Sequence, residues 1–543
     1  MKNGFEADLI LCGNHIFTAK DEGTLEGFVA IKGKQIIAVQ SMAHMEEFVS
    51  QNTKVIECKD QLIMPGFHDS HTHLLMAMIF DNAVNLYHAK SENEAAEMVA
   101  KHAVEQQKDD SLIVGFDWNS SLWSNQYPTK DSLDRLIPDR PVLLTKLEGH
   151  GAWLNSKALE LFNITKDSDI IEGGAIQKDA TGEPTGYIDE KAVLILYDTA
   201  SSILFPTVET AERKLKKAFE GLSENGITAI SDLFWSYDSV VLALENLEKS
   251  GELDVRFNFA LFPTPENEKD IPSYWEKYQS DQLRFLGVKY LYDGVVLGYT
   301  ADLLEPYADC PETTNILPID YTAFKNEILK VDRTGYRVRI HCIGDKAVRD
   351  ALDIFEECQK INGKRDSRHS IAHIEVLNPK DAARFRELGV IADVHPAHIT
   401  LASEKYEDNA YASRLGDREK FCFNYKSLFD EGAKIAMGSD VPIVVPNPML
   451  GIYRAVTRRF DDGLPVDGWI PEQKIPVDEV LRFYTMGSAY HDFIDQKTGT
   501  LEEGKLADIA VIDRNLLEIP SEQIRDAKVI MTICDGKIVF PKN

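Results

Sequence analysis

Short apolar runs alternate with helical patterns through most of the chain. The expected strands are 62–68, 227–233, 255–262, 285–291, 337–342, 370–375, 390–395 and 434–438. The expected helices are 208–224, 322–334, 346–359, 379–388 and 425–431. This alternation predicts parallel βα units. Eight strands is the number in a closed (β/α)8 barrel, although a doubly wound sheet fits the same pattern.

Both ends of the chain carry short strands and tight turns instead of helices. The strand-like runs at the two ends are 7–40, 53–64, 506–513 and 528–540. Hairpin loops are expected at Gly33-Lys34 and at Asp535-Gly536. The Asp-Gly pair is a strong hairpin signal. The sequence therefore predicts one β-domain assembled from residues 1–64 and 493–543.

A long segment, residues 76–205, interrupts the alternation. It contains an amphipathic helix near 92–107, strand-like runs at 112–116 and 141–147, and a glycine-rich stretch at 173–188. We expect these residues to form an insertion after the first barrel strand that covers the active site. The barrel domain is then 65–492, with the insertion inside it.

Composition and charge narrow the classes of function. The chain has 543 residues, of which 59 are Lys or Arg and 88 are Asp or Glu, so the net charge is −29. This charge argues against a nucleic-acid binder and against an anionic membrane surface. The seven cysteines are odd in number and none has CxxC spacing, which favours a reducing compartment. No run approaches the roughly 20 apolar residues of a membrane span, so a cytoplasmic protein is expected.

His71 and His73 form the first candidate metal-binding pair. They flank Thr72 at the end of an apolar run, and residues i and i+2 of a strand point to the same face. Two imidazoles would therefore converge at the end of a strand where barrel active sites are built. The alternative is a polar turn.

Other residues that can bind metal end further predicted strands. They are Lys289, His341, His373 and Asp440. A histidine on an apolar strand is more often a satisfied core residue, but a set on successive strand ends favours a metal centre. Lys289 can contribute only as a neutral amine, or after CO2 has converted it into a carbamate. Otherwise it would form a buried ion pair, with Asp293 as a local candidate.

Long motifs link these candidates in one order along the chain. The motifs are PGFHDSHTHL, LEGHGAWLNSKAL, VKYLYDGVVLGYTADLLEPY, IHCIGDKAV, HPAHI, AMGSDVP and GTLEEGKLADIAVID. They resemble the amidohydrolase superfamily, and within it amidohydrolase family 3, which includes N-substituted formamide deformylases. The resemblance implies an α/β fold: a (β/α)8 TIM barrel with a composite β-sandwich built from both termini. It also implies a metal-dependent hydrolase of a non-peptide C–N bond.

The resemblance implies a role for each candidate ligand. One ion would be held by His71, His73, Asp440 and a carbamate on Lys289, and a second by the same carbamate, His341 and His373. Zn²⁺ is expected, with one or two ions, while Mn²⁺, Fe²⁺ or Co²⁺ would also suit imidazole and carboxylate ligands.

The implied mechanism is attack of a metal-activated hydroxide on the amide carbonyl of a small molecule. A metal lowers the pKa of bound water from about 15.7 to about 7. The other metal or His373 would polarise the carbonyl, and Asp440 would act as general base and then as general acid. The same site could cleave an ester, a lactone or a carbamate. A non-enzymatic small-molecule binding or regulatory protein is the third hypothesis, and the complete ligand set speaks against it.

Six further residues are expected to line the substrate pocket. They are Trp118, Trp123, His150, Asn155, Tyr299 and His398. Asn155 could instead cap a helix, and the two tryptophans could be core material. His395 is the alternative to His398 as a substrate contact.

Four positions depart from the family pattern. Tyr299 stands where many relatives have arginine, Val441 where they often have tryptophan, Ala372 where a glutamate is frequent, and His395 where glutamine is common. The change at Tyr299 would remove an anion-binding group, and the change at Val441 would widen the pocket. The expected partner is a small-molecule substrate, with no nucleic acid or membrane, and a homodimer is the commonest closed assembly.

Overall fold

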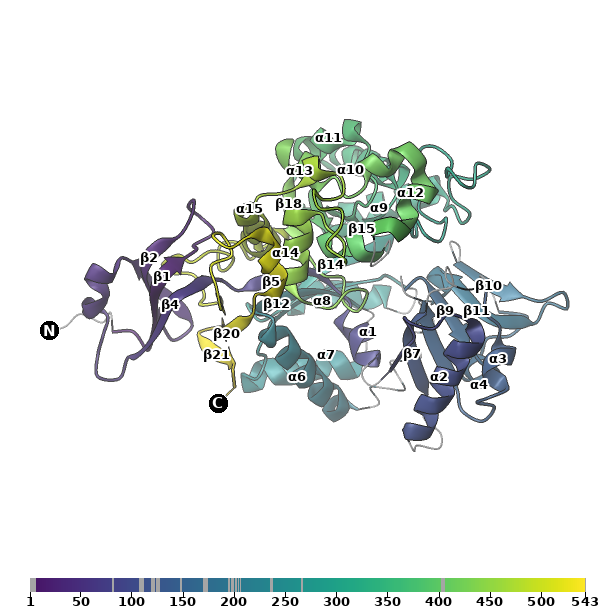
Figure 1. The fold of residues 1–543 in the computed structure, drawn as a ribbon, viewed down its shortest axis with the longest axis horizontal. Helices are drawn as coiled ribbons and strands as arrows, with labels where there is room; N and C mark the ends of the chain where they lie inside the picture. The colour runs from purple at the N-terminus through teal and green to yellow at the C-terminus, as the bar shows by residue number, and fades with distance from the viewer. Residues whose placement is uncertain are drawn as a thin grey trace.

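The computed structural model describes most of residues 6–542. The segments outside the described part are 81–82, 107–111, 119–122, 124–126, 147–148, 169–173, 194–195, 197–199, 201–202, 204, 206, 235–237, 265–266 and 402–405. The start of the expected glycine-rich stretch and the residues between Trp118 and Trp123 thus lie outside it. Three sheets organise the described residues. A barrel lies in the centre, a sheet built from the chain termini at one end, and the insertion at the other (Figure 1).

Eight parallel strands form the central barrel, in the order β18-β17-β16-β15-β14-β13-β12-β5. They are β5 (Phe67–Thr72), β12 (Ile227–Phe234), β13 (Arg256–Leu261), β14 (Leu283–Leu291), β15 (Val338–Cys342), β16 (Ser370–His373), β17 (Ile391–Val394) and β18 (Lys434–Met437). The first and last strands meet where the Asp440 amide donates to the His71 carbonyl at 2.8 Å. The expected (β/α)8 barrel is confirmed, and seven of its strands lie where the apolar runs predicted them.

Helices cover the outside of the barrel and connect its strands. They are α1 (Leu74–Ile79), α6 (Val208–Glu224), α7 (Asp238–Ser250), α8 (Ile271–Lys277), α9 (Tyr321–Arg333), α10 (Asp345–Asn362), α11 (Ala382–Leu388), α12 (Ala410–Leu415), α13 (Tyr425–Asp430), α14 (Pro448–Thr457), α15 (Val477–Arg482) and α16 (Ser488–His491). The Thr207 hydroxyl caps α6, and Asp320 caps α9. Among the described helices, none combines the length and apolar content that a bilayer crossing requires.

The first barrel strand differs from its expected range because the chain changes sheets at Gly66. The apolar run 62–68 is divided between β4 (Lys54–Pro65), in the terminal sheet, and β5, in the barrel. A Cβ at position 66 would lie 2.3 Å from the Thr228 side chain, so only glycine fits this crossing. The apolar pattern does not show whether one run forms a single strand or is divided between strands of two sheets.

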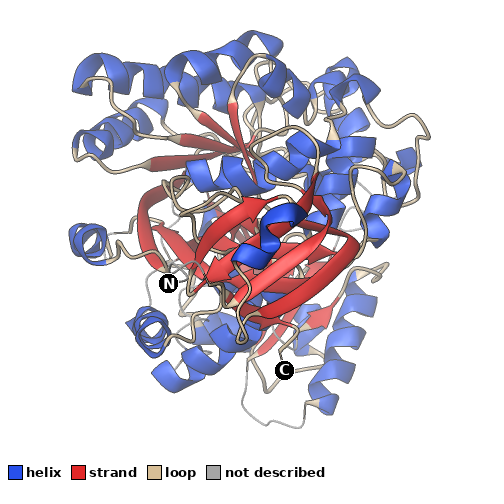
Figure 2. Cartoon of the chain, turned by 90° about the vertical axis from the view of Figure 1, so that its left-hand side faces the viewer, coloured by secondary structure: helices blue, strands red, loops and turns tan. Residues whose placement is uncertain are grey.

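Strands from both ends of the chain form one seven-stranded sheet, in the order β21-β20-β19-β4-β1-β2-β3. In addition to β4 they are β1 (Leu9–Ile16), β2 (Leu25–Lys32), β3 (Gln35–Gln40), β19 (Ile509–Ile512), β20 (Val529–Cys534) and β21 (Lys537–Phe540). Figure 2 shows this sheet from its own end of the molecule. Asp535 and Gly536 join β20 to β21 with φ values of +54° and +78°, as a two-residue hairpin requires.

Arg256, the first residue of β13, fastens the terminal sheet to the barrel. Its guanidinium is fully buried and donates to Asp508 at 2.6 Å and to Asp535 at 2.9 Å. Both carboxylates belong to the C-terminal part of the chain. Because a buried charge needs a partner, these ion pairs depend on the correct docking of the two sheets.

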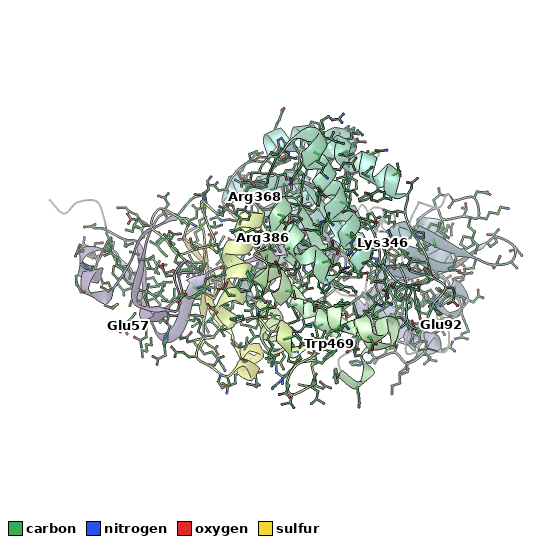
Figure 3. The ribbon with its side chains drawn as sticks, turned by 90° about the horizontal axis from the view of Figure 1, so that it is seen from above. Glu57, Glu92, Lys346, Arg368, Arg386 and Trp469 are labelled. Carbon is green, nitrogen blue, oxygen red and sulfur yellow. The ribbon has the colours of Figure 1, made fainter. Side chains whose placement is uncertain are left out.

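The insertion forms a sheet of its own, in the order β10-β11-β9-β8-β7-β6. Its elements are β6 (Val84–Asn85), α2 (Glu92–Glu105), β7 (Ile113–Trp118), α3 (Lys130–Asp134), β8 (Val142–Lys146), β9 (Gly151–Leu154), α4 (Ser156–Leu161), β10 (Gly174–Lys178) and β11 (Pro184–Glu190). Figure 3 shows Glu92 of α2 and Glu57 of β4 at opposite ends of the molecule. The bulk of the insertion therefore stands beside the barrel, opposite the terminal sheet.

Candidate metal centre

The predicted metal ligands lie together at the carboxyl end of the barrel. They are His71 in β5, His73 directly after it, Lys289 in β14, His341 in β15, His373 at the end of β16 and Asp440 after β18. Five of these six side chains are at least nine-tenths buried, and that of His73 is 22% exposed. Parallel strands end on one side of a barrel, so residues far apart in sequence converge there.

His71 and His73 are oriented by hydrogen bonds on their Nδ1 atoms. His71 Nδ1 lies 2.9 Å from Asp393 Oδ2, and His73 Nδ1 lies 2.9 Å from the Leu233 carbonyl oxygen. Burial, with Lys289 and His395 nearby, keeps the pKa of His71 well below its ordinary value. A neutral ring that donates through Nδ1 carries a lone pair on Nε2. His71 therefore presents Nε2 to the centre as an acceptor, and His73 does the same when its ring is neutral.

These two lone pairs face a carboxylate. Asp440 Oδ1 lies 3.2 Å from His73 Nε2 and 3.5 Å from His71 Nε2, and it accepts no hydrogen bond within the described part of the chain. Acceptors that face one another repel unless a cation lies between them. Zinc bonds of about 2.0–2.2 Å at a tetrahedral angle separate the ligand atoms by about 3.4 Å. The donor set and its spacing therefore fit a metal ion.

Lys289 is buried beside this pair. Its Nζ lies 3.4 Å from His71 Nε2, and the residue is 1% exposed. Burial and the nearby Arg339 lower the pKa of Lys289 to about 7. The alternative ion pair with Asp293 is not formed, because the Asp293 carboxylate accepts from the backbone amides of Ile343 and Gly344.

His341 and His373 lie on the next two strands with their ring centres 4.3 Å apart. His373 Nδ1 is 3.9 Å from Asp440 Oδ2, whereas His341 Nδ1 is 3.3 Å from Asp293 Oδ1. Three groups of donors within 4.8 Å of one another are found among the described residues. They are His71–His73–Asp440, His373–His398–Asp440 and His71–His373–His395. His341 thus lies beside the centre but outside these groups.

His398 lies between two carboxylates. Its Nδ1 is 3.1 Å from Glu375 Oε1 and its Nε2 is 3.4 Å from Asp440 Oδ2. Burial lowers the pKa of His398, but the contacts with Asp440 and Glu375 outweigh it and raise the pKa to about 9. Burial raises the pKa of Asp440, whereas the contacts with His398 and His73 lower it. The contacts outweigh burial, so the pKa of Asp440 lies well below its ordinary value. His398 is therefore part of the cluster itself.

His395 is the first histidine of the HPAHI motif, and it also reaches the cluster. Its ring centre lies 4.5 Å from that of His71 and 4.7 Å from that of His373. Burial lowers the pKa of His395 to about 4, so the ring is neutral at pH 7. The sequence offered His395 and His398 as alternatives, but both are present at the centre.

Carboxylates behind the cluster orient the imidazoles, and sequence reasoning did not identify them. Asp393 contacts His71 and also accepts from Ser70 at 2.6 Å and from Arg339 at 2.9 Å. Glu375 contacts His398, as described, and accepts from the Tyr411 hydroxyl. Such partners fix the tautomer and the orientation of a ligand histidine. Asp393 stands two residues before His395, but nothing local to the sequence pairs it with His71.

Among the predicted pocket residues, His150 reaches the centre from the insertion. Its ring centre lies 5.4 Å from that of His341, and its Nδ1 lies 2.7 Å from Glu190 Oε2. His150 therefore contributes a polar group beside the cluster. Its partner Glu190, at the end of β11, was not singled out by the sequence.

Asn155 is a helix cap. Its side-chain oxygen accepts from the amides of Ala158 and Val142, and its amide group donates to the carbonyls of Ile137 and Arg140. All of its hydrogen-bonding capacity is used by the backbone. The helix-cap alternative is therefore confirmed, while the expected pocket role stays a prediction.

Trp118 and Trp123 belong to the core of the insertion. Their rings are stacked with centres 5.3 Å apart, within a buried cluster that includes Trp153 and Tyr187. The Trp118 and Trp123 indole N–H groups donate to the carbonyls of Leu144 and Ala89. The core alternative is therefore confirmed for both residues, while their expected contact with substrate stays a prediction.

Tyr299 lies apart from the histidine cluster in a polar contact of its own. Its hydroxyl is 3.2 Å from Asp309 Oδ2, and the Arg414 guanidinium lies 4.2 Å from its ring centre. Arg414 pairs with the same aspartate. The structure thus shows the Tyr299 hydroxyl bonded to Asp309, and its expected contact with substrate stays a prediction.

A pocket of about 280 Å³ opens between the insertion and the barrel loops after β17 and β18. It is lined by Tyr87, Asp117, Ala397, Leu401, Ile443, Val444, Val445, Leu450, Arg454 and Asp461. Ala397 adjoins His398, and the Ile443 amide donates to the Asp440 carbonyl at 2.9 Å. Two lining residues of the pocket are thus adjacent to residues of the histidine cluster, which itself does not line the pocket.

Comparison with known proteins gives matches over nearly the whole chain. The profile of a family described as the amidohydrolase family matches residues 54–540. The putative amidohydrolase YtcJ of Bacillus subtilis is 29% identical over 98% of this chain and 99% of its own. The N-substituted formamide deformylase of Arthrobacter pascens is 22% identical over 98% of each chain.

A solved structure gives the same result. The crystal structure of an uncharacterized metal-dependent hydrolase from Pyrococcus horikoshii superposes with a TM-score of 0.75 at 26% identity, covering 95% of this chain and 99% of that chain. The description of that protein as a metal-dependent hydrolase agrees with the histidine and aspartate donors at the carboxyl end of the barrel in this chain. The chain belongs to the amidohydrolase family of metal-dependent hydrolases.

Proposed function

We propose that this enzyme hydrolyses a non-peptide amide C–N bond of a small molecule at a zinc centre. The observation that carries the proposal is a set of three converging atoms, His71 Nε2, His73 Nε2 and Asp440 Oδ1. Asp440 Oδ1 lies 3.5 and 3.2 Å from the two nitrogens and accepts no hydrogen bond among the described residues. Zn²⁺ bound there would lower the pKa of a water molecule to about 7 and polarise the substrate carbonyl. Mn²⁺, Fe²⁺ and Co²⁺ suit the same donors.

Asp440 is the proposed proton carrier. The water oxygen forms a bond to the carbonyl carbon, the C–N bond breaks, and Asp440 passes the proton of the water to the leaving nitrogen. Its low pKa keeps it ionised and ready to accept that proton. His373 faces the same carboxylate and would polarise the substrate carbonyl. His150 would bind the substrate from the side of the insertion.

Lys289 is proposed to carry a carbamate. Its neutral amine adds to CO2 with loss of one proton, and the product replaces a cation with an anion that offers two oxygen ligands. A pKa of about 7 leaves much of the amine neutral near pH 7. The contact with His71 puts the new carboxylate beside the donor set, where His341 and His373 would complete a second site.

The pocket supports a small substrate with an apolar group. Five of its lining residues, Leu401, Ile443, Val444, Val445 and Leu450, are aliphatic. Asp117 adds a carboxyl whose pKa burial raises to about 6. We also infer a cytoplasmic enzyme, because all seven cysteines are unpaired, and we propose no nucleic-acid or membrane partner.

A matched substrate panel tests the proposal. An amide, an ester, a lactone and a carbamate with the same apolar acyl group would be assayed with the zinc-loaded protein and after chelation. Metal-dependent turnover that is fastest on the amide is the expected result. Faster ester, lactone or carbamate cleavage would move the function to that bond. Bound small molecules without turnover, together with an absence of metal, would support a binding protein instead.

A further inference from the structure

His395 is a buried histidine with one nitrogen that nothing in the described structure uses. It lies between β17 and the turn that carries His398, and it is fully buried. Its ring faces His71 and His373 at centre distances of 4.5 and 4.7 Å. The ligand roles given above to the predicted residues do not include it.

One hydrogen bond fixes the chemistry of this ring. His395 Nδ1 lies 3.1 Å from the Gly438 carbonyl oxygen, which can only accept, so Nδ1 carries the hydrogen. In the neutral tautomer Nε2 then carries a lone pair. That atom has no hydrogen-bond partner among the described residues. His71 and His73 are likewise anchored through Nδ1, by Asp393 and by the Leu233 carbonyl.

We propose that His395 is a metal ligand through Nε2, at the centre where it lies beside the donors of His71 and His373. The donor atoms of these three residues lie within 4.8 Å of one another, and all three side chains are buried. Three neutral imidazoles are a donor set that suits Zn²⁺. The Gly438 carbonyl is the outer partner that holds the ring in place. This inference rests on the metal centre of the proposed function.

A substrate contact is the competing role for His395. It fits the burial poorly, because His395 is fully buried with the rings of His71 and His373 against it. His398 differs in this respect, since both of its nitrogens already face carboxylates. The free nitrogen and the donor set around it therefore favour a ligand.

The first test needs no variant. A crystal structure of the zinc-loaded protein, with the ion located by anomalous scattering, should give a His395 Nε2–metal distance of about 2.0–2.1 Å. A distance beyond about 3 Å in the metal-loaded protein would overturn the inference while leaving the proposed function standing. Absence of zinc from the wild-type protein would reject the proposed function itself.

The second test is His395→Asn, because an asparagine amide can still donate to the Gly438 carbonyl but lacks a group at Nε2. Competition with a chelator should show a zinc Kd at least about 100-fold higher, which exceeds the loss of about 10–100-fold expected for an outer partner. The visible spectrum of the Co²⁺ form should change as well. His369→Asn is the matched control, because both ring nitrogens of that buried histidine are used by Asp332 and Val338. An unchanged Kd and spectrum in folded His395→Asn would refute the ligand role.

Discussion

Glu190 holds His150 at the junction between the insertion and the barrel, with Glu190 Oε2 2.7 Å from His150 Nδ1. The other carboxylate oxygen accepts from the Thr300 hydroxyl, in the loop that follows β14. One side chain thus links the insertion to the barrel wall and orients an imidazole beside His341. The φ of Glu190 is +52°, a conformation that costs free energy for a residue with a side chain and is concentrated at functional sites.

We predict that Glu190→Gln lowers kcat/KM about 10–100-fold. The change removes a charge-assisted hydrogen bond worth about 1.5–3 kcal/mol, and each 1.4 kcal/mol is about tenfold in rate. Zinc content should stay at the wild-type level, because neither Glu190 nor His150 belongs to the donor groups. Glu160→Gln, on the exposed surface of α4, is the control. Loss of metal in Glu190→Gln would contradict a role that acts through His150.

Asp440→Asn should separate proton transfer from metal binding. The amide keeps the size of the side chain and one oxygen but cannot accept the proton, so kcat should fall by about 10²–10⁴-fold. Metal analysis should still detect a substantial amount of bound zinc. Asp430→Asn, in a solvent-exposed pair with Lys426, is the comparison variant. If Asp440→Asn turned over at the wild-type rate, another group would have to carry the proton.

Lys289→Ala should lose at least one metal ion and most activity. Short carboxylic acids should restore part of both, because an added carboxylate can occupy the space left by the carbamate. Metal content per chain and activity would be measured with and without propionate. The direct check is a density map from crystals of the zinc-loaded wild-type protein. The crystals would be grown with bicarbonate near neutral pH. An unmodified lysine pointing away from the ion would exclude the carbamate.

Arg256→Met is predicted to destabilise the fold without touching the site. Removing one partner of a buried pair costs about 3–5 kcal/mol, because Asp508 and Asp535 would remain as uncompensated charges. Urea unfolding of the two proteins would give the difference in free energy. Arg514→Met, which removes an exposed pair with Asp513, should change stability by no more than about 1 kcal/mol. Equal effects of the two variants would mean that the buried pairs do not couple the sheets.

The sequence predicted the barrel well because its signals are local. Each strand is one apolar run, each amphipathic segment is one helix, and the ligands stand at strand ends that the runs define. The i, i+2 spacing of His71 and His73 is a property of a single strand, and it is present as expected. The split at Gly66 was not predictable in this way, since it depends on the close approach of Thr228.

The residues that the sequence did not identify depend on contacts between distant segments. The Asp393–His71 contact spans 322 positions and Glu190–His150 spans 40, and neither has a local signature. For Asn155 the sequence left two roles open, because the same amide suits a helix cap and a pocket. Residue type and motif therefore identified candidate ligands that lie close together, but not the groups that orient them.

The change of sheet at Gly66 has a consequence for synthesis of the chain on the ribosome. β4, which leads straight into the ligand-bearing strand β5, pairs on one side with β1 and on the other with β19. Because β19 ends at Ile512, that second edge stays open until about 450 further residues have been made after β4. An open strand edge is a template for pairing with other chains. The nascent protein thus carries the strand of its first candidate metal ligands next to an exposed edge during this time, and a chaperone that shields residues 54–65 would protect both.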